Sequence, residues 1–245
     1  MTHREKINSE LDAWRRRLET PPTSSYKTVK RIQRRINLFM PRSMHHLIAK
    51  IVKETTRAVL QGAQYTTPKR EFTLQIHNAE EMIRESIWFY SSSAAAQGAI
   101  TGLGGLVSSI ADFPLWISLK MKMLFEIAGY YGFDTLCFKE RLFILHIFQL
   151  AFSSQDRRVA ALAHIENWSE VAQTLPDNLH AFDWERFQDE YRDNLDIVKI
   201  FQLIPGVGAV IGACVNQKLT YRLGKTAMNA YRIRLMKEDR LAIAN

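Results

Sequence analysis

The sequence predicts an all-α protein, a multi-helix bundle with two central glycine-rich apolar helical hairpin segments. Apolar residues recur three and four positions apart along most of the 245-residue chain, which is the spacing of one helix face. No stretch alternates apolar and polar residues between turn signals, as a half-buried strand would. Apolar residues make up 47 % of the chain, so a core can form without metals or disulfides.

Proline and aspartate mark several of the expected helix ends. Pro21 and Pro22 interrupt the chain after the first helix, and Pro41 ends the second. Asp134 is expected to cap a later helix by accepting backbone N–H bonds. We expect helices over residues 7–18, 26–40, 41–62, 68–88, 116–129, 136–152, 156–175, 183–196 and 217–239.

Positive charge is concentrated in one stretch of the chain. Residues 21–70 contain eleven Lys/Arg and one acid, a net charge of +10, although the whole chain carries only +8. A local basic surplus favours a local docking surface. We divide the chain into an N-terminal helical region with a basic amphipathic helix, residues 1–64, and a helical domain, residues 65–245.

The basic amphipathic helix is expected over residues 26–40. Such helices bind anionic membrane surfaces, so an anionic membrane surface or a membrane protein is the expected partner. A solvated face packed on the acidic residues 183–196 is an alternative reading. Nucleic acid is not expected, because no groove-reading or base-stacking motif accompanies the charge. The cationic face consists of Lys27, Lys30, Arg31, Arg34 and Arg35.

Two apolar segments are rich in glycine. In residues 91–119 the only ionisable side chain is Asp112, and residues 200–215 contain no Asp, Glu, Lys, Arg or His. Small residues four positions apart let two helix backbones approach closely. Both segments fall short of a clean membrane span, so a crossing, a re-entrant hairpin and a tightly packed core all stay open. The glycines are Gly98, Gly102, Gly104 and Gly105 in the first segment and Gly206, Gly208 and Gly212 in the second.

Two blocks of sequence resemble the EcsC family. They are GAITGLGGLVSSIADFPLWISLKMKMLFEIAGYYGFD at residues 98–134 and IPGVGAVIGACVNQKLTYRLGKTAMNAYRIRL at residues 204–235. Their order and separation also match, and they anchor the similarity across roughly residues 65–240. The family is named after a gene found beside ABC-transporter genes. The resemblance implies a helical, membrane-linked accessory role and no particular chemistry.

Isolated polar residues near the apolar segments are the candidate site. Asp112 is either a helix cap or a buried carboxylate with a raised pKa. Glu126 follows fourteen residues later, about 20 Å along a helix, which is too far for paired acid–base work; pairing with Lys122 is its simpler role. One face of the last predicted helix carries a polar seam that we expect to face Asp112. The expected network is Asp112, Asn216, Tyr231 and Arg234.

Familiar metal and cofactor motifs are missing from the sequence. It contains no HExxH, CxxC, GxSxG or P-loop pattern, so neither a metal nor a cofactor is expected. Cys137 and Cys214 have apolar neighbours and are expected to be buried thiols in a reducing compartment. The first seventeen residues lack the apolar run of a secretion signal, which favours the cytoplasm, at the inner face of the cell membrane.

Three functions remain open at this level. The favoured one is a peripheral or re-entrant membrane accessory protein, linked to an ABC transporter or to lipid, without defined catalysis. The second is a hydrolase-type enzyme that uses Asp112 or Glu126 in a helical cleft. The third is a soluble carrier with an apolar ligand in its glycine-lined core.

Overall fold

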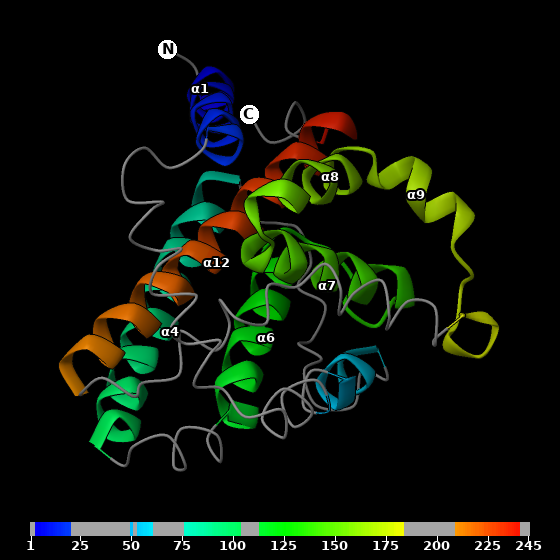
Figure 1. Cartoon of the computed structure of the whole chain (residues 1–245). Coiled ribbons are helices and arrows are strands. Elements are labelled where there is room, and N and C mark those ends of the chain that lie inside the picture. Colours follow the sequence, from blue (N-terminus) through cyan, green and yellow to red (C-terminus); the bar gives the residue numbers. More distant parts are fainter. Residues whose placement is uncertain are drawn as a thin grey trace.

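The computed structural model describes residues 3–20, 50, 53–60, 76–103, 113–183 and 209–240. The elements in this part of the chain are helices (Figure 1), which confirms the predicted all-α class. Residues 53–60 are also helical. The labelled elements are α1 (His3–Glu19), α4 (Ile76–Leu103), α6 (Phe113–Tyr130), α7 (Phe138–Phe152), α8 (Gln155–Glu166), α9 (Trp168–Thr174), the 3₁₀ turn η1 (Leu179–Ala181) and α12 (Ala209–Lys237).

The two longest of the described helices, α4 and α12, lie side by side and run in opposite directions through the bundle (Figure 1). Helix α6 packs against both, and α7 packs against α12 and α8. Residue numbers in contact rise along α4 as they fall along α12: position 80 meets 232, position 87 meets 224, and position 94 meets 216.

A glycine allows the close approach of α4 and α12. A Cβ added to Gly224 would lie 2.6 Å from Cγ1 of Ile87, closer than real Cβ atoms come, and 3.0 Å from its Cγ2. Ile87 is itself fully buried. Glycine inside a helix costs about 1 kcal/mol relative to alanine, and here that cost accompanies tight packing between the two central helices.

One apolar core joins the ends of the chain. Helix α7 is buried on almost every side, because it lies between α12, α6 and α8. Helix α1 packs on α8 and α12, and its Ile7 and Leu11 belong to the same buried cluster as α7. The first helix of the predicted 1–64 region is therefore part of the bundle.

Several predicted helix boundaries differ from the structure. Helix α4 continues past Gly98 to Leu103, and α12 begins at Ala209 instead of about 217; the two helices pack against each other. The predicted 156–175 helix is divided at Asn167, where the backbone leaves the helical region.

Helix α6 ends as its glycines predict. Gly132 has a φ of 74°, a left-handed conformation that glycine adopts freely. Its amide donates to the Gly129 carbonyl, and the Phe133 amide donates to the Ala128 carbonyl, which is the Schellman pattern. Asp134 then accepts a bond from the Leu136 amide at 2.9 Å, so it stabilises the turn before α7.

The prediction of buried thiols was wrong. Cys137 and Cys214 are both exposed. Cys137 is the N-cap residue of α7, and Cys214 lies in the first third of α12. Apolar neighbours in sequence do not bury a residue when it sits at a helix end or on an outward face.

Some sequence predictions lie outside the described residues. These are the basic helix over 26–40, Asp112, most of the acidic run 183–196, and Gly104, Gly105, Gly206 and Gly208 of the glycine-rich segments. Gly98 and Gly102 lie in α4 and Gly212 lies in α12. No helix within the described parts of the chain combines the length and the apolar character needed to span a bilayer.

Replacing Gly224 with alanine tests the close helix contact. On helix propensity alone, Gly224→Ala would stabilise the protein by about 1 kcal/mol. We expect instead a net loss of about 1–3 kcal/mol, because the new methyl group overpacks against Ile87. Urea unfolding measures this loss. Ile87→Ala in the same chain removes the opposing carbons, so the two losses should not add; a Gly224→Ala variant as stable as the parent contradicts the close contact.

Candidate functional site

A buried lysine lies near the middle of the bundle, where α4, α6 and α12 meet. Lys120 of α6 is only 1 % exposed. Its Nζ donates to Oδ1 of Asn216 on α12 at 3.0 Å and lies 3.7 Å from the centroid of the Trp116 ring. Lys120 and Trp116 are four residues apart and so share a face of α6. We call Lys120, Trp116, Asn216 and the Ala94 carbonyl the Lys120 cluster.

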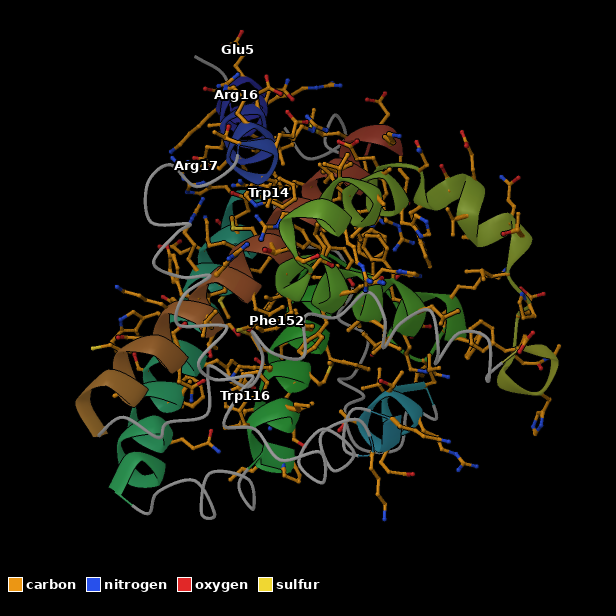
Figure 2. The ribbon with its side chains drawn as sticks, in the orientation of Figure 1. Glu5, Trp14, Arg16, Arg17, Trp116 and Phe152 are labelled. Atoms are coloured by element: carbon orange, nitrogen blue, oxygen red, sulfur yellow. The ribbon has the colours of Figure 1, made fainter. Side chains whose placement is uncertain are left out.

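Asn216 connects the three helices of this cluster. Its Oδ1 also accepts a bond from the Trp116 indole Nε1 at 2.6 Å, and its Nδ2 donates to the Ala94 carbonyl of α4 at 2.7 Å. The amide therefore uses both its acceptor and its donor group in the interior. The Trp116 side chain extends into the core, where its ring centroid lies 6.0 Å from that of Phe152 at the end of α7 (Figure 2).

Burial lowers the pKa of Lys120 well below its ordinary value of 10.5. Among the described residues no carboxylate pairs with the ammonium group, and desolvation is the cause of the shift. A desolvated amine of lowered pKa can act as a base or a nucleophile when a reactant reaches it. The tight packing of Trp116 and Asn216 around it is equally suited to holding three helices together.

A second buried polar group holds α4, α12 and α1 together. Arg232 donates from Nε and Nη2 to the two carboxylate oxygens of Glu80, at 2.6 and 2.8 Å, and both side chains are fully buried. Its Nη1 donates to Glu10 of α1 at 2.7 Å. Arg84 approaches Glu80 from the surface at 2.9 Å. The paired carboxylates raise the pKa of Arg232, so it stays charged.

A third buried group lies between α7 and α12. Glu140 accepts a bond from the Tyr231 hydroxyl at 2.6 Å and one from Arg234 Nη1 at 2.6 Å. Burial raises the pKa of the Glu140 carboxyl, although Arg234 opposes the shift. The Arg234 guanidinium also lies over the rings of Phe133 and Phe143, at 4.1 and 4.9 Å from their centroids.

The predicted polar network therefore consists of separate groups. Asn216 belongs to the Lys120 cluster, whereas Tyr231 and Arg234 belong to the Glu140 group. Fifteen residues of one helix separate Asn216 from Tyr231, a rise of about 22 Å. The spacing of these residues in the sequence places them on one face of the helix, but it does not bring them into contact. Asp112, their expected partner, lies outside the described residues.

Glu126 is held by two hydroxyl groups of α4. Its carboxylate accepts a bond from Ser86 Oγ at 3.1 Å and one from the Tyr90 hydroxyl at 2.8 Å. Burial and the adjacent carboxylate raise the pKa of Tyr90. These bonds link α6 to α4 and replace the pairing with Lys122 that the sequence left open. Use of Glu126 in a hydrolase remains a prediction.

Lys120, Trp116, Glu80 and Glu140 were not among the predicted site residues. One signal in the sequence could have indicated Lys120, because Lys120 and Lys122 are the two lysines in the otherwise apolar sequence of α6. Their partners come from helices 90 or more residues away in sequence, which periodicity cannot identify. Within the described residues no group of three His, Cys, Asp or Glu side chains is placed to hold a metal ion.

Comparison with known proteins gives one family over nearly the whole chain. The sequence model of the EcsC protein family matches residues 5–236. Protein EcsC of Bacillus subtilis (strain 168) is 38 % identical over 239 residues, which cover 97 % of this chain and 98 % of that protein. Uncharacterized protein YdbA of the same organism is 27 % identical over 218 residues, 81 % of this chain and 80 % of that protein.

No solved structure matches the chain. The family match begins at residue 5, so the similarity covers α1 and the basic stretch as well as the two glycine-rich blocks.

Replacing Lys120 with methionine tests whether the buried amine costs stability. Because the folded-state pKa of Lys120 is lowered, the unfolded chain binds the proton more readily between that pKa and 10.5, so stability rises with pH in this window. We expect Lys120→Met to be as stable as the parent near neutral pH, or about 1 kcal/mol more stable.

The pH dependence of the stability of this variant separates the effect of a charged Lys120 amine from that of a neutral one. Any advantage of Lys120→Met should shrink as the pH rises toward 10, as measured by urea unfolding across the pH range. If Lys120→Met is less stable than the parent by several kcal/mol, and this difference in unfolding free energy does not change with pH, the buried amine does not cost stability.

Two arginines that bond the same carboxylate provide a matched pair of variants. Arg232 is 1 % exposed and the Arg84 side chain is 43 % exposed, yet both donate to Oε2 of Glu80. Arg232→Ala leaves a buried carboxylate without its main partner and should cost about 3–5 kcal/mol. Arg84→Ala should cost about 1 kcal/mol or less. Equal losses in thermal unfolding would show that burial does not control the strength of this network.

Proposed function

Because the chain belongs to the EcsC protein family, we propose that it is a peripheral membrane accessory protein that docks on anionic lipid at the inner face of the cell membrane. The observation that carries this proposal is the separation of charge along the chain. Residues 21–70 have a net charge of +10, while residues 71–245 contain seventeen Lys/Arg and twenty acids, a net charge of −3.

The described part of the basic stretch supports this reading. Residues 53–60 are helical, with Val59 and Leu60 buried against the core and with Lys53, Glu54 and Arg57 exposed. These two cations are four residues apart, so they project from one side of the helix. A helix that is anchored by apolar residues and presents cations outward fits a negatively charged surface.

Energy considerations favour lipid as the partner of the basic stretch. Each Lys or Arg close to an anionic membrane contributes about 1 kcal/mol, and the attraction decays within about one Debye length. Eleven such residues provide enough energy for reversible docking without a spanning helix. An association with an ABC transporter stays a prediction from the family resemblance.

Vesicle flotation tests the docking proposal. The intact protein should float with phosphatidylcholine vesicles that contain phosphatidylserine, and it should remain behind when the vesicles lack phosphatidylserine or the salt concentration is high. Replacing Lys27, Lys30, Arg31, Arg34 and Arg35 by glutamine should weaken binding by at least about tenfold, since about 1.4 kcal/mol already corresponds to that factor.

A second set of substitutions controls for total charge. Arg4, Lys6, Arg16, Arg17 and Arg157 are exposed cations outside the basic stretch. Replacing these five by glutamine removes the same charge and should leave flotation largely unchanged. Equal recovery with and without phosphatidylserine, or equal losses in the two variants, would overturn the proposal.

A further inference from the structure

Helix α4 ends, and helices α6 and α12 begin, at the same side of the molecule. The turns of the three helices at this side contain no charged side chain. The C-terminal end of α4 and the N-terminal end of α12 lie together (Figure 1), as required by the contact between Ala94 and Asn216. Helix α6 begins at this side, because Trp116 and Lys120 reach the same Asn216. We call residues 92–103, 113–119 and 209–217 the uncharged end, since they contain no Asp, Glu, Lys, Arg or His.

The neighbouring segments of sequence continue this composition. Residues 200–208 also lack ionisable side chains, and residues 104–112 contain one, Asp112. By contrast, the opposite halves of α4 and α12 hold the Glu80–Arg232 pair and its neighbours. The uncharged ends of the two central helices therefore lie together, and the Glu80–Arg232 pair lies toward their other ends.

Large apolar side chains are exposed at the uncharged end and at its border. Leu115, in the first turn of α6, is 56 % exposed. On α4, Trp88 is 70 % exposed and Phe89 is also exposed; together with Arg84 and Glu85 they line a shallow surface groove. Tyr221 is the exposed aromatic residue at the corresponding level of α12. Large apolar side chains that are exposed in one region of a protein surface mark an interaction surface.

The residues at the border indicate the chemistry of the partner. Tryptophan and tyrosine are enriched where a membrane meets water, because their rings are apolar and their polar groups stay hydrated. Among the described residues, the first exposed charges beyond the uncharged end are Lys122 on α6, Lys218 on α12 and Glu85 on α4. The two lysines lie nearer to the end than Glu85 does, and they complement anionic lipid headgroups.

We infer that the uncharged end enters the headgroup and upper acyl region of one leaflet of an anionic bilayer, with Trp88, Phe89 and Tyr221 at the interface. Residues 92–103 rise about 18 Å along α4, and residues 209–217 about 14 Å along α12. The hydrocarbon core is about 30 Å thick, so neither length is enough to cross it. Ser92, Ser93 and Gln97 within the end suit a shallow position.

The inference rests on the proposed docking to anionic lipid and adds the orientation of the protein on the membrane. The basic stretch provides attraction at a distance, and the uncharged end provides apolar contact once the protein has arrived. Among the described residues Lys120 is the buried charge nearest to this end, and its contacts with Asn216 and Trp116 keep it within the bundle.

A fluorescent label on each of two matched positions tests the orientation. Leu115 and Val159 are aliphatic residues with nearly equal exposure, 56 % and 58 %. Leu115 begins α6 at the uncharged end, whereas Val159 lies on α8, away from it. After Cys137→Ser and Cys214→Ser, Leu115→Cys and Val159→Cys can each carry the environment-sensitive dye NBD on a single thiol.

We expect phosphatidylserine vesicles to shift NBD emission at position 115 to the blue, with a several-fold gain in intensity and quenching by nitroxide-labelled lipid. The dye at position 159 should keep its emission in buffer. Flotation of both labelled proteins without a change at position 115 would overturn the inference while the proposed docking stands. Loss of flotation itself would overturn both.

One further outcome identifies a different partner. A shift at position 115 in buffer alone that grows with protein concentration would show that a second copy covers the uncharged end. That result would also overturn the insertion into lipid.

Discussion

The antiparallel contact between α4 and α12 is the constraint on which the rest of the structure depends. Gly224 allows the two backbones to approach over Ile87, and this approach sets the register of both helices. The register then places Glu80 beside Arg232 and Ala94 beside Asn216. Helices α6 and α7 complete the bundle by adding Lys120 and Glu140 to polar side chains already presented by α12.

The same register divides polar and apolar groups between two ends of the molecule. Charged groups in a protein interior are costly unless they are paired and hydrogen-bonded. Glu80, Arg232 and Glu140 satisfy this condition through partners on other helices, so they specify which helices meet. Lys120 satisfies it only in part, with an amide and an aromatic ring as its partners. Within the described residues the three helices contain no charge beyond Lys120, as our inference that this end contacts a less polar medium requires.

The sequence predicted the helical class and much of the α12 polar face, but not the contacts of that face. Helical spacing places Asn216, Tyr231 and Arg234 along one side of a helix, but Asn216 bonds to Lys120 whereas Tyr231 and Arg234 bond to Glu140. Their partners, Lys120 and Glu140, lie on α6 and α7, and helix packing decides which residues meet. The predicted helix over 68–88 stopped before the first glycine-rich segment, whereas α4 continues to Leu103 and packs against α12.

The central claim is that the α4–α12 register gives the protein one membrane-facing end, and hydrogen exchange measured by mass spectrometry tests it most directly. On phosphatidylserine vesicles, we expect slower amide hydrogen exchange than in buffer in peptides from residues 92–103, 113–119 and 209–217. Peptides from α8 and from the charged half of α12 should exchange as they do in buffer. Slower exchange confined to α8, or uniform along α12, would contradict the claim.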